Sequence, residues 1–327
     1  MTKPILFWLL AMVFLATALP VMAQQPKKVT PIGYLVGPTL SANAARSEAF
    51  RQGLRELGYV EGKNIVIEWR SAGEKPDRLP ALAAELVRLK VEIIVTTGST
   101  PTRAAREATA TIPIVMTNEA NPVADGIVAS LARPGGNITG LSTLAPELSD
   151  KRLEILREVV PKLSRVAVLG TSTVPGLAQM IREIELAAKA IGVKLQNVDV
   201  LDSKDIETGF RAASKGRAQA LLTLGGGILF SQRGQIAELA VKNRLPAIYH
   251  QSQYVEAGGL MFYGVNVLDL DRRAATYVDK ILKGAKPADL PVEQPKKFEF
   301  IINLKAAKQI GLTIPPNVLV RADRVIK

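Results

Sequence analysis

Residues 32–39 read IGYLVGPT, a short apolar run that ends in glycine, proline and threonine, and residues 165–172 read RVAVLGTS, a second run of the same kind. Each begins a series of short apolar runs and longer amphipathic segments, which reaches EIIVTTGS in the first half and ALLTLGGG in the second. Gly37 precedes the glycine that ends the next helical segment by 21 residues, and Gly170 precedes its counterpart by 22. The sequence therefore contains the same α/β unit twice.

The pattern within each unit predicts the type of sheet. Short β-branched runs alternate with segments that carry an apolar residue every three to four positions, which is typical of βαβ units and a parallel sheet. With 327 residues, 47% of them apolar, the chain can fill two cores. We therefore expect two similar, doubly wound parallel-sheet α/β lobes joined by a hinge. Strands are expected at residues 32–36, 65–69, 93–97, 114–117, 166–169, 194–198, 220–223 and 247–249.

The repeat also predicts the domain boundaries. The first lobe is expected to cover residues 24–142, and the second lobe residues 143–263. The segment DRRAATYVDKILKG (271–284) has the pattern of a further helix. We expect this helix to return to the first lobe, which residues 264–292 then complete. Residues 293–327 form a C-terminal segment that the sequence assigns to neither lobe.

The first 23 residues have the organisation of a secretory signal peptide. Lys3 precedes an apolar stretch from Ile5 to Leu19, and small residues precede a cleavage site after Ala23. A membrane anchor is the alternative, but the stretch is shorter than the roughly 20 residues that span a bilayer. The chain has no cysteine, so neither a lipid anchor nor a disulfide is expected. These features predict a periplasmic protein.

The positive net charge raises the question of a nucleic-acid partner. The formal charge is +12, or +11 without Lys3. Lysines and arginines never run longer than two together and mostly stand beside acids, as in KRLEILRE (151–158), which we interpret as a solvated helix face. We therefore expect no nucleic-acid partner.

The stretch VEIIVTTGSTPTRAA (91–105) is the strongest candidate for a ligand-binding loop. In open parallel sheets, ligands bind beyond the carboxyl ends of the strands. Here four hydroxyl side chains follow a predicted strand, and Thr100-Pro101 has the pattern of an N-cap followed by proline. Hydroxyls and unpaired N–H groups at a helix start suit a carboxylate or another anion. Simple capping of the turn is the alternative, but it needs one hydroxyl.

Four long stretches carry a resemblance to a known family: TTGSTPTRAAREATATIPIVMTNEANPVADGIVASLARPGGNITGLS (96–142), PAIYHQSQYVEAGGLMFYG (246–264), RRAATYVDKILKGAKPADLPVEQP (272–295) and FIINLKAAKQIGLTIP (300–315). They resemble the substrate-binding proteins of bacterial ABC importers, in the group that includes tryptophan- and tyrosine-binding members. The resemblance implies a type I periplasmic-binding fold, with two lobes on a multi-strand hinge that close over a small solute. It also implies delivery to an inner-membrane permease that a separate ATPase powers.

The resemblance implies ligand contacts in the first lobe and departs from the family in the second. The implied first-lobe contacts are Thr97, Ser99, Thr100 and Asn121, the last where relatives usually have aspartate.

In the second lobe, Thr171 and Ser172 stand where relatives tend to have an Asn-Pro loop, and Gly226 stands where they commonly have aspartate. A buried ammonium group needs an anionic or carbonyl partner, so these changes argue against an ordinary α-amino acid. We expect the first lobe to hold the polar or anionic end of the ligand, and the second lobe to supply shape.

Three further residues are expected near the cleft. Thr39 lies in the loop after the first strand. His250 ends a strand that faces the cleft, and a purely structural role is its alternative. Tyr263 lies at the crossover between the lobes, where it can stack on an aromatic ligand or belong to the core.

The sequence offers no catalytic constellation. With one histidine and no cysteine, a typical zinc site or Cys–His site cannot be assembled, and Glu119 lacks a carboxylate partner. GGGILF (225–230) matches neither the phosphate-binding nor the dinucleotide-binding glycine motif. We predict a monomeric protein without a cofactor that binds an amino acid-like, aromatic or carboxylate-bearing solute. The alternatives are an exported two-lobed α/β enzyme and a ligand-sensing protein that is presented to a membrane receptor.

Overall fold

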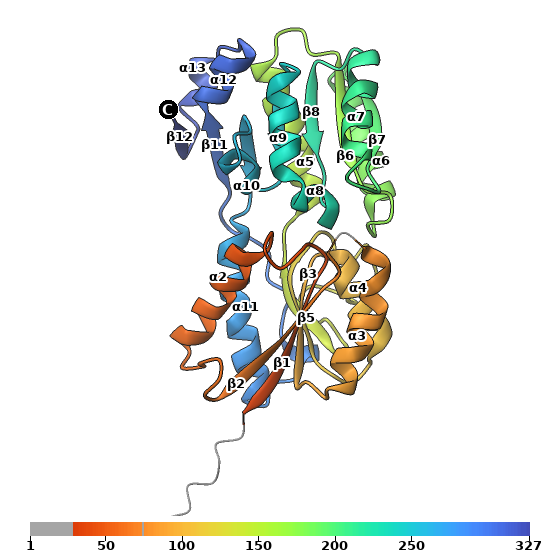
Figure 1. Cartoon of the computed structure of the whole chain (residues 1–327), viewed down its shortest axis with the longest axis vertical. Coiled ribbons are helices and arrows are strands. Elements are labelled where there is room, and N and C mark those ends of the chain that lie inside the picture. Colours follow the sequence, from red (N-terminus) through yellow and green to blue (C-terminus); the bar gives the residue numbers. More distant parts are fainter. Residues whose placement is uncertain (1–28, 74) are drawn as a thin grey trace, which may run out of the picture.

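The molecule consists of two α/β lobes stacked along its long axis, each with helices on both faces of a central sheet (Figure 1). The computed structural model describes residues 29–73 and 75–327, so the predicted signal peptide lies outside the described residues. The predicted fold class is confirmed, because the chain forms two separate sheets in which almost every neighbouring pair of strands is parallel.

The first lobe contains a five-stranded parallel sheet in the order β2-β1-β3-β4-β5. Its strands are nearly continuous apolar runs because both faces of the sheet are covered. The strands are β1 (Thr30–Val36), β2 (Ile65–Ser71), β3 (Ile93–Thr97), β4 (Ile114–Glu119) and β5 (Ile138–Ser142).

Helices cover the two faces of this sheet in pairs. One pair, α2 and α11, packs through the cluster around Phe50 and Leu270, and the other pair, α3 and α4, packs through the cluster around Leu86 and Ala105. Since α11 follows the last parallel strand of the second lobe, the chain returns to complete the first lobe's outer layer (Figure 1). The elements are α2 (Ala44–Glu56), α3 (Leu79–Arg88), α4 (Ser99–Ala108), α11 (Val267–Leu282) and the 3-10 turns η1 (Pro76–Arg78) and η2 (Pro287–Asp289).

The second lobe contains a seven-stranded sheet in the order β12-β11-β10-β9-β8-β6-β7. It departs from a purely parallel sheet at one place, where β11 runs antiparallel to β10. The C-terminal segment that the sequence assigned to neither lobe supplies two of these strands. The strands are β6 (Arg165–Gly170), β7 (Lys194–Asp199), β8 (Ala220–Thr223), β9 (Ala247–Tyr249), β10 (Met261–Gly264), β11 (Glu299–Asn303) and β12 (Arg324–Ile326).

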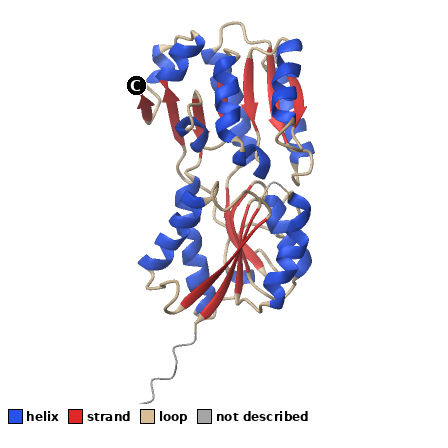
Figure 2. Cartoon of the chain, viewed as in Figure 1, coloured by secondary structure: helices blue, strands red, loops and turns tan. Residues whose placement is uncertain are grey.

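Two apolar clusters fill the faces of the second sheet, one around Leu156 and Ile184, the other around Phe210 and Ile236. Figure 2 shows the helices arranged as layers on either side of the strands. The helices are α5 (Ala145–Val159), α6 (Leu177–Ala190), α7 (Asp205–Lys215), α8 (Gly227–Ser231), α9 (Arg233–Lys242), α10 (Gln253–Glu256), α12 (Leu304–Ile310) and α13 (Pro316–Leu319).

The internal repeat is visible in the strand order. The first lobe places its strands as β2-β1-β3-β4, and the second lobe places the corresponding strands as β7-β6-β8-β9. Both lobes therefore reverse their winding at the same strand, where open α/β sheets bind ligands.

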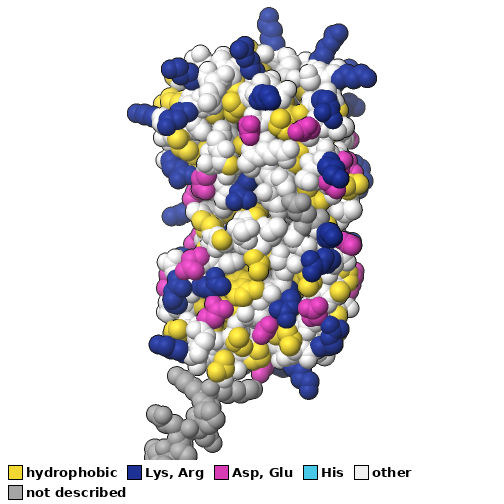
Figure 3. All heavy atoms as spheres, in the orientation of Figure 1, with side chains coloured by type: hydrophobic (Ala, Val, Ile, Leu, Met, Phe, Trp, Pro, Cys, Tyr) yellow, Lys and Arg dark blue, Asp and Glu magenta, His cyan; other side chains and the backbone are white. Residues whose placement is uncertain are grey.

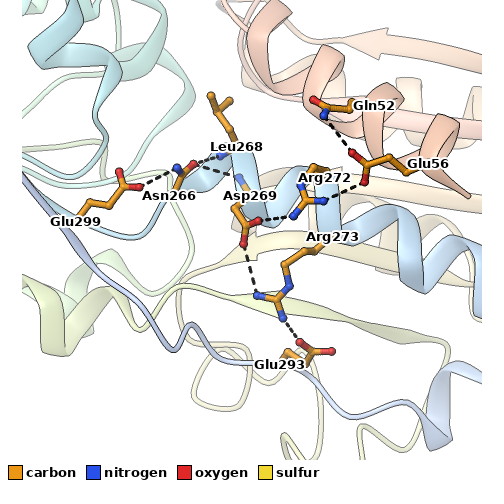
Figure 4. A network of polar contacts seen from close by, with 9 residues as sticks. All are labelled: Gln52, Glu56, Asn266, Leu268, Asp269, Arg272, Arg273, Glu293 and Glu299. Carbon is orange, nitrogen blue, oxygen red and sulfur yellow. Dashed lines mark hydrogen bonds and ion pairs between the residues drawn. The ribbon is translucent and has the colours of Figure 1, made fainter. Parts of the chain in front are cut away.

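The chain crosses between the lobes in three places: from β5 to α5, from β10 to α11, and from the segment after η2 to β11. The third crossing pairs with β5, since Ser142 donates its N–H to the Glu293 carbonyl. Figure 4 shows side chains that connect the second crossing to the third. Asn266 caps α11 and donates to Glu299 at the start of β11, at 2.9 Å, while Arg273 pairs with Glu293.

One predicted helix start is wrong by two residues. The helix predicted to be capped by Thr100 begins at Ser99.

The physical reason for this earlier start is Gly98, which has a φ of +87°. A glycine with positive φ closes the strand-to-helix turn at position 98, two positions before the predicted cap at Thr100.

On the face of the molecule drawn in Figure 3, charged side chains do not gather in one patch. On the face in Figure 3, lysines and arginines lie on both lobes with acidic side chains among them. Among the described helices, none is long and apolar enough to cross a membrane.

Candidate functional site

A cleft lies between the two lobes, where the loops at the carboxyl ends of both sheets face each other. It encloses about 1300 Å³ of empty space, part of which is open to solvent. The first lobe lines it with the loops after β1 and β3, including Gly37 and the turn from Thr97 to Pro101. The second lobe contributes the loops after β6, β8 and β9 and one face of α5.

Six of the ten predicted site residues line this cleft. They come from both lobes, as expected for two sheets that face each other. The six are Thr97, Ser99, Thr100, Thr171, Gly226 and His250.

The other four predicted residues are not among those that line the cleft. Asn121 lines a separate small pocket, and its Oδ1 accepts the Ala124 N–H at 3.3 Å. Thr39 stabilises the turn before α2. Ser172 donates its hydroxyl to Asp199 at 2.6 Å, so this side chain is already paired.

Tyr263 has a supporting position instead of a lining one. Its ring packs near Phe298 and Phe300, with centroid separations of 6.3 and 6.1 Å. Its carbonyl oxygen accepts a hydrogen bond of 2.7 Å from Nε of Arg152, which does line the cleft. Tyr263 thus fixes the position of a cleft residue through its backbone.

The hydroxyl-rich turn after β3 is only partly available to a ligand. Ser99 donates its hydroxyl to Oε1 of Glu119, which lies behind the turn. Thr97 Oγ1 is buried with no hydrogen-bond partner among the described residues, although it lines the cleft. Thr97 and Thr100 are therefore the groups of this turn that can receive a ligand.

Glu119 is a fully buried carboxyl group at the end of β4. Its Oε1 accepts from Ser99 and from the Ala120 N–H, whereas Oε2 has no partner among the described residues. Burial raises the pKa of Glu119 to about 7, and the hydrogen bond from Ser99 opposes this shift. The group thus changes protonation near neutral pH.

Arg152 on α5 is a site residue that the sequence analysis missed. The interpretation of KRLEILRE as a solvated face is wrong at this position, because Arg152 is 3% exposed. It lies four residues after the buried Leu148 and four before the buried Leu156, so the helical period places it on the inner face. That spacing is the signal that could have identified it.

The guanidinium of Arg152 has no acidic partner among the described residues. Nε donates to the Tyr263 carbonyl, and Nη1 donates to Ser149 Oγ at 3.3 Å, so both acceptors are neutral. Burial lowers the pKa of Arg152 to about 9, which leaves it protonated at neutral pH. The cleft therefore contains an uncompensated positive charge.

A second arginine in the cleft, Arg46 on α2, is compensated. Its Nε lies 2.6 Å from Oδ2 of the fully buried Asp271, and it also donates to Thr117 Oγ1. The side chain is held by α11, and its charge is neutralised inside the protein.

His250 follows β9 and adds a neutral polar group to the cleft. Its Nδ1 lies 3.1 Å from Thr223 Oγ1, while Nε2 is buried with no partner among the described residues. Burial lowers the pKa of His250 to about 3, and the nearby Arg152 and Arg46 lower it further. When Nδ1 accepts from Thr223, Nε2 carries the ring hydrogen and can donate to a ligand.

The walls of the cleft are mainly apolar, and the described lining residues include no aspartate or glutamate. The charged groups among them are Arg46 and Arg152. No group of three or more His, Asp or Glu side chains in the described part of the chain could hold a metal ion.

The lobes touch across the mouth of the cleft. A Cβ atom added to Gly227 at the start of α8 would lie 3.4 Å from the carbonyl carbon of Gly37. On another side, Asp125 of the first lobe lies against Gly176, the residue before α6. The structure therefore represents the protein with its lobes closed.

Two similar α/β lobes that close over an apolar cleft with a few polar groups define a solute-binding protein. The family model described as ABC transporter substrate binding protein matches residues 35–326, and the chain belongs to this family.

Known proteins resemble the chain over most of its length. It is 25% identical over 265 residues to a tyrosine-binding protein of Clostridioides difficile (strain R20291), covering 81% of this chain and 76% of that protein. The structure of an ABC domain in complex with L-Trp from Streptococcus pneumonia aligns with a TM-score of 0.84 and 23% identity, covering 91% of this chain and all of that one.

A ligand-free, open substrate-binding protein with adhesive properties from Clostridium difficile aligns with a TM-score of 0.64 and 26% identity, over 91% of this chain and all of that one.

Proposed function

We propose that this protein is a periplasmic binding protein that captures a small amino acid-like, aromatic or carboxylate-bearing solute between its lobes. It then delivers the solute to an ABC permease in the inner membrane, and the transporter's ATPase powers uptake. The mature protein begins at Gln24 after signal-peptide cleavage and acts as a monomer. Family membership supports the transport role, and the tyrosine-binding and L-Trp-bound relatives support a ligand of amino acid size.

The observation that carries this proposal is the composition of the cleft. Both lobes line it with apolar side chains and a few polar groups, and the lobes touch at its mouth. Pockets of this kind bury most of a small ligand's surface and fix its orientation through few polar contacts. Lobe closure around such a ligand requires each lobe to supply part of the site.

We also propose that the protein binds its ligand without chemical conversion. The titratable groups among the described lining residues are Arg46, Arg152 and His250, and Asp271 already neutralises Arg46. The buried carboxyl group of Glu119 is engaged by Ser99 and the backbone. This arrangement pairs no acid with a base at a reacting atom.

The test is a thermal-shift screen of purified mature protein against amino acids, aromatic acids, nucleosides and aliphatic carboxylates. A ligand that binds the folded state alone raises the melting temperature with concentration. Small-angle scattering with and without each hit should then show a smaller radius of gyration at saturation. Absence of any concentration-dependent hit, or recovery of the solute as a different product, contradicts the proposal.

A further inference from the structure

The contacts that Arg152 makes with the protein leave its positive charge in the cleft without a compensating anion. The guanidinium is buried, it lines the cleft, and it is held from two sides by the Tyr263 carbonyl and Ser149 Oγ. Both contacts fix its orientation, and neither compensates its charge. No described residue accepts a hydrogen bond from Nη2.

The comparison with Arg46 shows that this fold does compensate a buried arginine where the charge is structural. Arg46 has a bidentate contact with Asp271, with donor–acceptor distances of 2.6 and 3.0 Å. An unpaired buried charge is costly, and it persists where an opposite charge from outside completes the site. Arg152 therefore has the environment of a group whose anionic partner arrives with the ligand.

We propose that Arg152 binds the carboxylate of an apolar monocarboxylic acid that lacks an α-ammonium group. This inference deepens the proposed function and rests on it. A planar guanidinium matches a carboxylate in geometry, and a charge-assisted hydrogen bond in a largely enclosed site is stronger than a neutral one. His250 Nε2 and Thr171 Oγ1 are buried cleft atoms without partners among the described residues, and they can complete the acid's hydrogen bonding.

The exclusion of an ammonium group follows from the charges on the cleft walls. No described lining residue is acidic, whereas two are arginines. Glu119 is not among the described lining residues: it is fully buried, and its Oε1 accepts from Ser99 and from the Ala120 N–H, which belong to residues that do line the cleft. A zwitterion would therefore bury its ammonium group without an anionic partner, in a cleft whose uncompensated charge is positive.

The rest of the cleft suits an apolar body. Apolar side chains of the second lobe, from α5, α6 and α8, line the cleft. The turn from Gly225 to Gly227 also lines it and contributes no side chain. Because Arg152 is the single uncompensated cation among the described lining residues, a dicarboxylate would bury a second charge without a partner. The apolar lining residues include Leu148, Leu177, Met180, Leu224 and Phe230.

The test compares three probes of nearly equal shape by calorimetric titration of the mature protein. They are 3-phenylpropanoate, its neutral amide 3-phenylpropanamide, and L-phenylalanine, which adds an ammonium group. The wild-type protein should bind 3-phenylpropanoate about 30-fold or more tightly than the amide, since truncating one partner of a buried charge pair typically has at least this effect. L-Phenylalanine should also bind at least about 10-fold more weakly than 3-phenylpropanoate.

The variant Arg152→Met should lose this preference by binding the acid about 30-fold more weakly while keeping its affinity for the amide. Arg157→Met is the matched control, because it makes the same change of residue and charge on the exposed side of α5. Arg152→Lys keeps the positive charge but loses the planar guanidinium, which can bind a carboxylate through two N–H groups. This variant should retain part of the preference for the acid over the amide. Circular dichroism and the melting temperature of each unliganded variant report whether it is folded.

Three outcomes separate this inference from the proposed function. Preference for the acid in the wild type that disappears in Arg152→Met supports the inference. Tighter binding of L-phenylalanine or of the amide, or acid binding that Arg152→Met leaves unchanged, overturns the inference and leaves solute binding intact. If the wild type binds none of the three probes but binds a neutral or amino solute from the screen, the carboxylate assignment is likewise wrong.

Discussion

Arg46 on α2 and Asp271 on α11 lie 225 residues apart in the chain and form a buried ion pair, with Nε 2.6 Å from Oδ2. The pair fastens the returning helix α11 to the first lobe at the edge of the cleft. Asp271 is completely buried, so neither charge is solvated by water. The two charges are therefore stable only together.

We expect Asp271→Asn to destabilise the protein by about 3–5 kcal/mol, because it leaves Arg46 buried and uncompensated. Urea unfolding followed by circular dichroism measures this difference. Asp289→Asn is the control: it removes the same charge from an exposed position in η2 and should change stability by less than about 0.5 kcal/mol. The double change Arg46→Met with Asp271→Leu should cost less than Asp271→Asn alone, and an equal cost would argue that the pair is not coupled.

Glu119 should make stability depend on pH. Its pKa is raised from 4.5 to about 7 in the folded state, so the folded protein binds more protons than the unfolded chain between these values. The free energy of unfolding should therefore decrease as the pH rises from about 4.5 to about 7, by a total of about 3 kcal/mol. Glu119→Gln removes this loss, and its stability relative to wild type should increase from pH 5 to pH 8.

The measurement for Glu119→Gln is urea unfolding of both proteins, without ligand, at intervals between pH 5 and pH 8. The same substitution at the exposed Glu107 on α4 serves as the control and should leave the curve close to that of the wild type. A stability difference between Glu119→Gln and wild type that stays constant with pH would show that the carboxyl does not titrate in this range.

The doubled architecture could be predicted because both lobes encode it in local patterns. The strands expected at 93–97, 220–223 and 247–249 have the observed bounds, and the other predicted strands differ by one or two residues at an end. Strands β5, β10, β11 and β12 were not predicted. In β5, the sequence ITGLS contains glycine and hydroxyl residues, and it becomes a strand through pairing with β4 and the crossing at Glu293.

The candidate site was predictable at the strand ends and not on the helix. Thr97 and His250 follow from the rule that loops at the carboxyl ends of parallel strands form the cleft. Arg152 depends on the packing of α5 under the second sheet, against partners as distant in sequence as Tyr263. From its neighbours in the sequence, a charged residue beside acidic residues is predicted to be exposed. Only the four-residue spacing of Arg152 from Leu148 and from Leu156 indicates that it is buried.

Closure should depend on the absence of a side chain at Gly227. The start of α8 lies against the loop after β1, with the Gly37 carbonyl carbon 3.4 Å from the position of an added Cβ. Gly227→Leu should therefore hold the lobes apart and weaken ligand binding about ten-fold or more. Small-angle scattering at ligand saturation measures the radius of gyration. Gly234→Leu on α9 is the control, since an added Cβ has no neighbour within 4 Å there; equal compaction of both variants would rule out Gly227 as a closure contact.

The charge selectivity of the cleft should reverse when an acidic side chain is added at Gly225. This residue lines the cleft, and an added Cβ meets no atom within 4 Å, so Gly225→Asp should fold normally. The new carboxylate should weaken binding of 3-phenylpropanoate by about ten-fold and strengthen binding of 3-phenylpropylamine, because opposite charges attract in a largely enclosed site. Gly226→Asp adds the same charge one residue further on, but its Cβ would lie 2.9 Å from Thr171 Oγ1, so it should also lower the melting temperature. Calorimetric titration with both probes decides the question, and an unchanged affinity ratio in Gly225→Asp would show that the bound solute does not sense the charge on this wall of the cleft.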